Sequence, residues 1–320
     1  MPAPLQWESP WEIATGVLIT SSIFATAVFM PIIGFFSTIF IPLPILFYRT
    51  KLGRQAGLTI GLISVAIMIM VLKSLDGLSI NILFFIELLL LGYVLSELFE
   101  KKMSIEKIIG YACATVFASA LILIFGYSLF TQTGLLKLVS DYVAQNLEVT
   151  LRIYEGMGIS QSTLNDIKAS LDRIQYILVR IIPGLATSGL LLVAWSNLLM
   201  AKPLFKRQFL KYPDFGNLNC WKTPEMLIWG LIGSGLLIIF PVSGLRMIGI
   251  NGLITMFTIY FFQGIAIVSF ILEKKKIPRI LQIFIYTMIA LQQILVLVVV
   301  GFGIFDMWID IRKLNSSKVS

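Results

Sequence analysis

Apolar segments long enough to cross a lipid bilayer recur along most of this chain. A hydrocarbon core about 30 Å thick is crossed by about 20 helical residues. Segments of this kind lie at about 13–30, 32–48, 55–72, 78–98, 107–130, 174–200, 224–241, 252–272 and 280–305. Because backbone groups cannot stay unpaired in lipid, these segments predict helices. The sequence therefore predicts an all-α fold, a polytopic transmembrane helical bundle.

The composition supports the same class. Hydrophobic residues make up 58% of the chain and charged residues only 13%, against about 25% charged residues in soluble domains. There is no histidine, and the two cysteines are Cys113 and Cys220. The commonest metal ligand and general base is thus missing, so we expect no enzyme activity and no cofactor. We attribute the net charge of +8 to basic cytoplasmic loops rather than to nucleic-acid binding.

The number of crossings depends on the first apolar run. No charged residue interrupts the chain from Ile13 to Tyr48, which is too long for one crossing. Pro31, Pro42 and Pro44 break this run, because proline lacks the backbone donor of a helix interior. Two tight crossings fit, and so does one crossing followed by a re-entrant piece. The sequence therefore predicts eight or nine crossings.

Lysine and arginine predict the orientation of the chain. They are concentrated in the loops at 49–54, 99–107, 202–222 and 273–279, which the positive-inside rule places in the cytoplasm. The long polar excursion at 131–173 then lies on the outer side. A nine-helix topology also puts the C-terminal tail outside, although the tail carries Arg312 and Lys313.

The excursion at 131–173 has the pattern of an amphipathic helical hairpin. Leu136, Val139, Val143 and Leu147 recur at three- and four-residue spacing, with polar residues between them. A turn at "EGMGIS" follows, and a second polar-surfaced helix leads into the sixth apolar segment. The hairpin either rests on the lipid headgroups or caps a cavity that opens outward.

Two charged residues lie inside apolar segments. Glu87 is in "NILFFIELLLLG" and Arg180 is in "IQYILVRIIPG". At 1.5 Å per residue, Glu87 lies about 13 Å and Arg180 about 9 Å below the outer boundary. We predict that the two side chains pair. The alternatives are that Arg180 extends to the headgroups while Glu87 is neutral, or that Arg180 binds an anionic ligand.

Asn197 and Gln263 are further polar residues of the apolar segments. Gln263 lies in the middle of its segment beside Gly264, which permits close backbone approach. Both amides should face protein. Each then serves either as a hydrogen-bonding contact between helices or as a contact for a ligand. The candidate substrate-binding residues are therefore Glu87, Arg180, Asn197 and Gln263.

The last hundred residues contain "CWKTPEMLIWG", "IGINGL", "YFFQGIAIVSFILEKKKIPR" and "GFGIFDMWIDIRK". These motifs resemble those of the YybS-like family of bacterial membrane proteins, also called domain of unknown function 2232. The matching positions are Trp221, Pro224, Trp229, Asn251, Tyr260, Gln263, Gly264, Pro278, Asp306, Trp308 and Arg312. The resemblance implies that the N-terminal helices are similar to the substrate-binding (S) subunits of energy-coupling-factor transporters. Such subunits hold a small molecule near the outer surface.

Together these observations predict one integral membrane domain over 1–320 in a bacterial cytoplasmic membrane. Residues 1–200 would form the helices similar to an S subunit, including the outer hairpin 131–173. Residues 201–320 would form the C-terminal helices that carry the family motifs. We expect a transport-related protein that captures a small molecule from the outer side. The alternative is a scaffold that organises partner proteins. The expected partners are the lipid bilayer, a small-molecule ligand and a membrane protein, and not nucleic acid.

Overall fold

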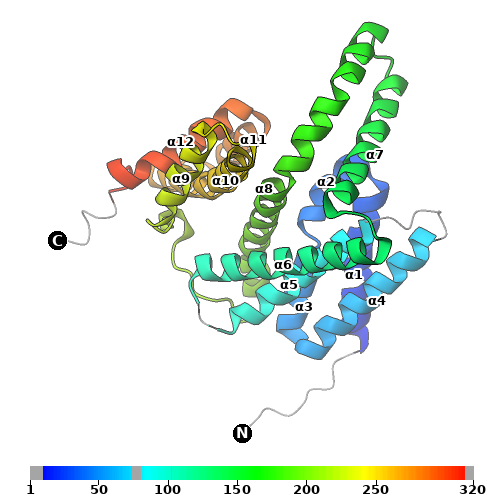
Figure 1. Cartoon of the computed structure of the whole chain (residues 1–320). Helices are drawn as coiled ribbons and strands as arrows, with labels where there is room; N and C mark the ends of the chain where they lie inside the picture. The colour runs from blue at the N-terminus through cyan, green and yellow to red at the C-terminus, as the bar shows by residue number, and fades with distance from the viewer. Residues whose placement is uncertain (1–9, 74–80, 102, 314–320) are drawn as a thin grey trace. The chain divides into compact units, whose positions relative to one another are not determined.

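A computed structural model of the chain describes residues 10–73, 81–101 and 103–313, and every regular element in these ranges is helical (Figure 1). The all-α prediction is confirmed. The α-helices are α1 (Pro10–Phe29), α2 (Pro31–Ile39), α3 (Pro42–Leu52), α4 (Arg54–Lys73), α5 (Asn81–Phe99), α6 (Ile105–Thr131), α7 (Leu135–Gly156), α8 (Gln161–Arg207), α9 (Leu227–Ile239), α10 (Ser243–Lys274), α11 (Arg279–Leu291) and α12 (Gln293–Ile309). A short 3₁₀ helix, η1, spans Leu218–Cys220.

The chain divides into two compact units. The first unit comprises Met1–Ala120 and Gly189–Gly216, and the second comprises Leu121–Ser188 and Asn217–Ser320. The long helices α6 and α8 each contribute one part to the first unit and one part to the second.

Proline residues divide the first apolar run of the first unit. Pro31 and Pro42 begin α2 and α3, where the missing N–H of proline costs nothing. The two helices contain 9 and 11 residues, whereas a crossing needs about 20. The segment 32–48, for which the sequence predicts one crossing or a re-entrant piece, is therefore a pair of short helices.

The core of the first unit is formed by α1, α3, α4 and α5. Its buried side chains are Phe24, Ile41, Ile45, Tyr48, Ile60, Met68, Leu72, Phe85, Leu88 and Leu89. Gly92 of α5 permits the close approach of α3, because a Cβ at this position would overlap the carbonyl oxygen of Pro42. This close packing positions the end of α3 against the end of α5.

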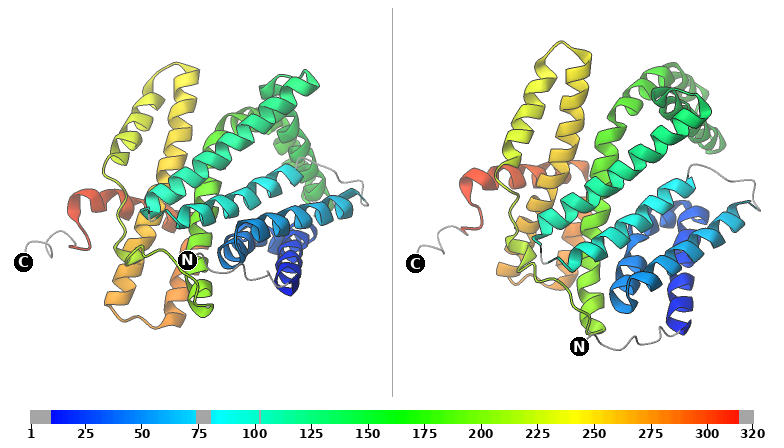
Figure 2. Two further views of the ribbon diagram at one scale, coloured as in Figure 1. Left: turned by 90° about the horizontal axis from the view of Figure 1, so that it is seen from below. Right: turned by 60° about the horizontal axis from the view of Figure 1, so that its bottom comes forward.

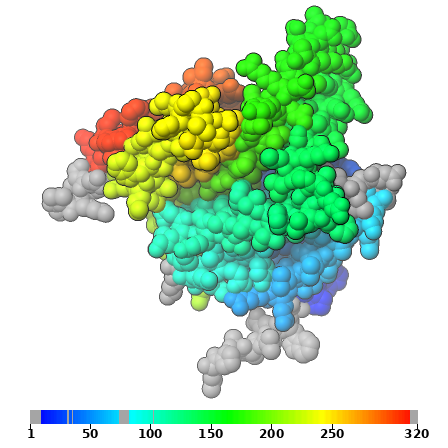
Figure 3. Space-filling view, in the orientation of Figure 1, coloured from blue at the N-terminus to red at the C-terminus, as the bar shows by residue number. Residues whose placement is uncertain are grey.

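The second unit contains the helical hairpin. Helix α7 is followed by a turn at 157–160 and by α8, and the two helices lie side by side (Figures 1 and 3). Lys168 and Glu155 form an ion pair of 2.8 Å between them. The two helices and the turn agree with the sequence, while the outer location of the hairpin stays a prediction. Helix α8 contains 47 residues, so the second arm and the sixth apolar segment form one continuous helix.

Among the last four helices of the second unit, α9 is short, and α11 and α12 are separated by a sharp bend. Helix α9 has only 13 residues, although its segment predicts a crossing. Helices α11 and α12 meet at an angle of 103° at Gln292, where the sequence predicts one uninterrupted crossing. Figure 2 shows that α12 runs across α10 while α9 runs alongside it.

The described residues form six helices that are long and apolar enough to cross a membrane, or seven if α11 and α12 make one span. Large apolar side chains are exposed on these and neighbouring helices, among them Leu62, Ile122, Trp229, Ile280 and Ile294. Such a surface suits lipid rather than water. The membrane class follows from these helices, whereas the count of eight or nine crossings stays a prediction.

Candidate functional site

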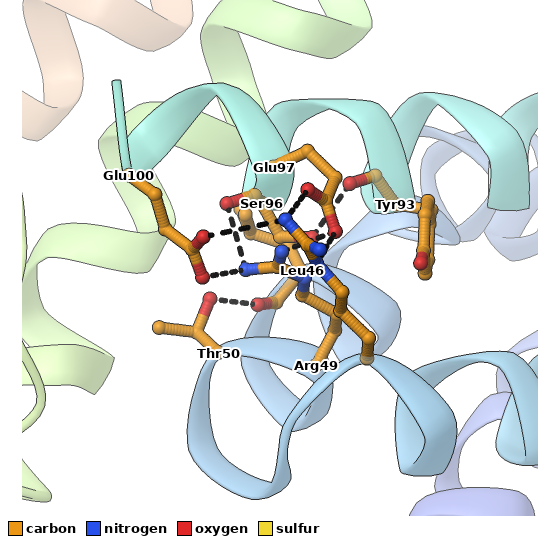
Figure 4. Close-up of polar contacts among 8 residues, drawn as sticks. Leu46, Arg49, Thr50, Tyr93, Ser96, Glu97 and Glu100 are labelled. Atoms are coloured by element: carbon orange, nitrogen blue, oxygen red, sulfur yellow. Dashed lines mark hydrogen bonds and ion pairs between the residues drawn. The ribbon is translucent and has the colours of Figure 1, made fainter. Parts of the chain in front are cut away.

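A network of charged residues lies where α3 meets the end of α5 (Figure 4). Arg49 of α3 is only 2% exposed. Its guanidinium donates to Glu97, to Glu100 at 2.6 Å and to the Ser96 carbonyl at 3.2 Å. Gly57 of α4 leaves room for the arginine, because a Cβ there would overlap the Arg49 side chain.

A second arginine completes this network. Arg54 donates to both carboxylate oxygens of Glu97, at 2.9 and 2.8 Å. Burial opposes the charge of Arg49, but its hydrogen bonds to Glu100 and Glu97 outweigh that effect, so the pKa of the guanidinium is raised. The network reaches the surface, because Arg54 is 66% and Glu100 60% exposed. It therefore joins α3, α4 and α5 and stays in contact with water at its edge.

A second polar centre lies in the other unit and is closed. Arg312 donates to Asp306 at 2.8 Å, and both side chains are 0% exposed. Gln263 of α10 donates to the same Asp306 oxygen at 3.2 Å. A fully buried ion pair needs additional hydrogen bonds to offset the loss of water, and Gln263 supplies one of them. We call Gln263, Asp306 and Arg312 the Asp306 centre.

Two features of the sequence place these side chains together. Gly264 and Gly303 let α10 and α12 cross closely, because a Cβ on Gly264 would overlap the Val299 carbonyl and one on Gly303 the Tyr260 carbonyl. After α12 the backbone turns sharply at Asp310, which has a left-handed conformation (φ 44°). This turn carries Arg312 back to Asp306, six residues earlier in the chain.

The centre also holds the segment that leads into α9, residues 217–226. Arg312 donates to the carbonyl oxygens of Asn219 at 2.8 Å and Trp221 at 2.9 Å. Gln263 accepts a hydrogen bond of 3.0 Å from the backbone N–H of Thr223. Backbone that is not helical needs such partners when it is buried. Gln263 and Arg312 thus replace hydrogen bonds that a longer α9 would have made internally.

Several buried polar atoms around the Asp306 centre have no hydrogen-bond partner in the protein. In the part of the chain that the structure describes, nine buried side-chain atoms are of this kind, and five belong to the centre and its neighbours: Asp306 Oδ1, Arg312 Nε, Thr223 Oγ1, Tyr260 OH and Asn219 Oδ1. Each atom left unpaired costs about 1–3 kcal/mol. Five at one place are a large local deficit.

A surface groove lies between the two arms of the hairpin. Its volume is about 490 Å³. Leu136 and Lys137 of α7 line it from one side, and Asp172, Tyr176, Val179 and Arg180 of α8 from the other. The groove therefore combines two cations and one carboxylate with apolar surface. Ligand sites combine apolar walls with a few polar groups in this way.

Asn251 of α10 holds the backbone beside this groove. Pro183 removes one donor from α8. The Asn251 carboxamide accepts from the Gly184 N–H at 2.6 Å and donates to the Arg180 carbonyl at 2.8 Å. These two groups would bond to each other in a regular helix. Asn251, which is one of the positions that match the family motifs, thus fixes the turn of α8 that bears Arg180.

The four predicted site residues have separate environments. Glu87 is buried in the first unit and accepts from Ser119 at 2.6 Å. Asn197 donates to the carbonyls of Ile39 and Val193, both at 2.7 Å. Arg180 donates to the Tyr176 carbonyl at 3.0 Å, with its guanidinium 3.3 Å from the Tyr176 ring centroid. Gln263 belongs to the Asp306 centre. The Glu87–Arg180 pair stays a prediction.

From the sequence, Asp306 was named only as part of the resemblance, and Arg312 there and as a charge of the C-terminal tail. Asp306 lies in the apolar run "GFGIFDMWI", so the argument that selected Glu87 also applies to it. Lys137 and Asp172 have no such signal, because charged residues are ordinary on the polar face of an amphipathic helix. Arg49 also has no such signal, because it belongs to a basic loop in the sequence.

Comparisons with known proteins agree with the resemblance. A family model described as "Predicted membrane protein (DUF2232)" matches residues 18–307. The uncharacterized protein YybS of Bacillus subtilis (strain 168) is 21% identical over 293 residues, which cover 89% of this chain and 91% of that protein. No solved structure gives a significant match, so the similarity to S subunits stays a prediction. Since the family model covers most of its length, the chain belongs to the DUF2232 family of multi-pass membrane proteins.

Proposed function

We propose that this protein captures a small anionic molecule in the groove between α7 and α8. The groove itself carries the proposal, because it places Lys137 and Arg180 around a volume of about 490 Å³. Two cations and one carboxylate, Asp172, favour a ligand with net negative charge. The apolar surface of Leu136 and Val179 suits a ligand that also has an apolar body.

Arg180 is the residue we assign to the anionic group. A guanidinium has five N–H donors, and one of them bonds to the Tyr176 carbonyl. The remaining donors suit the two oxygens of a carboxylate or phosphate. Asn251 supports this role, since it holds the Arg180 carbonyl from α10. The proposal is one of binding and not of catalysis, and it needs no cofactor.

We expect the hairpin on the outer side of a bacterial cytoplasmic membrane, because the positive-inside rule assigns the basic loops to the cytoplasm. Capture there would be the first step of a transport-related process. This reading agrees with the expected similarity to S subunits.

A scaffold for partner proteins is the second candidate. The observation that favours it is the hydrogen bonding of three predicted site residues. Glu87, Asn197 and Gln263 each bond to other groups of the protein, as residues that only hold helices together would do. A scaffold would have no need of the charged groove.

Native mass spectrometry of the detergent-purified protein tests the two candidates. We expect a small-molecule adduct on the unmodified protein, its loss in Arg180→Gln and its retention in Arg173→Gln, which changes an exposed arginine of the same helix outside the groove. An adduct that survives Arg180→Gln contradicts the assignment of the groove. A protein partner without any small molecule would favour the scaffold.

A further inference from the structure

We propose that the Asp306 centre is a binding site for ordered water inside the second unit. The inference is independent of the groove, because it rests on different residues of α10, α12 and the segment 217–226. Its basis is the five unpaired polar atoms that belong to one fully buried ion pair and to residues next to it.

The hydrogen bonds and close contacts of the centre bring the residues that carry these five atoms together. Gln263 bonds to both Asp306 and the backbone N–H of Thr223, so Thr223 lies next to the ion pair. Arg312 bonds to Asp306 and to the Asn219 carbonyl, which brings Asn219 close to the pair as well. Tyr260 lies one turn before Gly264, and its carbonyl is in close contact with Gly303, one turn before Asp306.

The chemistry of the five atoms fits water. Asp306 Oδ1 and Asn219 Oδ1 accept hydrogen bonds, Arg312 Nε donates one, and the hydroxyls of Thr223 and Tyr260 do either. A buried water typically makes about three hydrogen bonds and donates and accepts at once, so it can serve acceptors and donors together. A metal cation would meet the positive charge of Arg312 at the same place.

The ion pair itself points to the same conclusion. Asp306 uses only Oδ2, which accepts from both Gln263 and Arg312, and leaves Oδ1 without a partner. Arg312 uses Nη1 and Nη2 and leaves Nε. A buried ion pair is stable when the remaining lone pairs and protons are satisfied. Water supplies these bonds without any change in the protein.

Hydroxyl-radical footprinting of the protein in lipid nanodiscs tests the proposal. X-ray radiolysis produces the radicals in place from water, so a buried side chain is modified only where water lies beside it. Tyr260 and Phe24 are both 0% exposed, but Phe24 lies in an apolar core, where cavities are dry. We expect Tyr260 to be modified about tenfold faster than Phe24. Equal, slow rates in the unmodified protein would overturn the proposal.

A pair of variants separates bound water from general opening of the unit. The double variant Asp306→Leu/Arg312→Met replaces the ion pair by apolar side chains, and the Tyr260 rate should fall to that of Phe24. The control Lys222→Met/Asp310→Asn removes a partly exposed ion pair of 3.0 Å between the segment 217–226 and the turn after α12. It should leave the Tyr260 rate unchanged. A rate that persists in the first variant, or falls equally in both, contradicts the site. If the first variant does not fold, the rates in the unmodified protein still decide.

Discussion

The Arg49 network and the Asp306 centre each bury an arginine, but they do so in opposite ways. Arg49 has two carboxylate partners, Glu97 and Glu100, and the network continues to the exposed Arg54. Arg312 has one carboxylate partner, and its other hydrogen bonds are to backbone carbonyls. The first network is in contact with water through Arg54 and Glu100, whereas the ion pair of the second is fully buried.

This difference indicates what each arginine does for the fold. Arg49 joins regular helices and has one backbone acceptor, the Ser96 carbonyl in the last turn of α5. Arg312 satisfies carbonyl oxygens of a segment that is not an α-helix, and Gln263 satisfies an N–H of the same segment. The loss of Arg312 should therefore remove a partner from a buried carboxylate and from buried backbone carbonyls. The loss of Arg49, in contrast, leaves its carboxylate partners near another arginine.

The largest expected effect is that of Arg312→Met. It leaves the Asp306 carboxylate buried and unpaired, which typically costs about 3–5 kcal/mol. We expect a loss of this size in the free energy of unfolding, measured by denaturation in detergent micelles, or a failure to purify as a single species. The double variant Asp306→Leu/Arg312→Met should recover part of the loss, because it removes the unpaired charge. A double variant as unstable as the sum of the single variants would show that the pair is not coupled.

Arg49→Met should have a smaller effect. The variant loses hydrogen bonds to charged groups, each worth about 1.5–3 kcal/mol, but Arg54 still neutralises Glu97. We expect a decrease of about 1.5–3 kcal/mol in the free energy of unfolding by the same assay. A decrease as large as that of Arg312→Met would mean that the exposed part of the network contributes nothing, and the contrast between the two centres would be wrong.

The close crossing of α10 and α12 permits a third test. Gly264→Ala places a methyl group where the Val299 carbonyl lies, so the two helices must separate. Overpacking of this kind costs about 1–3 kcal/mol, and the separation should also weaken the Gln263–Asp306 bond. The matched control is Gly301→Ala of α12, where nothing lies within 4 Å. The control should be neutral or slightly stabilising, since alanine favours a helix. Equal effects of the two changes would contradict the close crossing.

The helical class could be predicted from the sequence because lipid leaves the backbone few options. The positions at which helices end or bend were harder to predict. They could be recognised only where particular residues mark them. Pro31 and Pro42 mark the ends of helices directly. The bend at Gln292 has no proline or glycine next to it, and only the polar pair Gln292 and Gln293 interrupts the apolar run there. It depends on the packing of α12 against α10, which is a tertiary effect.

The candidate site shows the same division. Gln263 could be predicted to face protein, and it is fully buried. Its partners could not be predicted, because Thr223 and Asp306 lie about forty residues away on either side. Arg49 illustrates the converse error. A basic residue at the end of an apolar segment indicates orientation, and only the packing of α3, α4 and α5 shows that this one is buried.

The smallest expected effect separates the exposed edge of the Arg49 network from its buried part. Arg54 is 66% exposed, and an ion pair of this kind is worth about 0–1 kcal/mol. Arg54→Gln should therefore lower the free energy of unfolding by less than about 1 kcal/mol, and its effect should shrink further in high salt, because salt screens exposed charges. The effect of Arg49→Met should change little with salt, since the guanidinium is buried. If both effects depend equally on salt, the Arg49 side chain is accessible to water. The proposed difference between the buried and the exposed part of the Arg49 network would then be wrong.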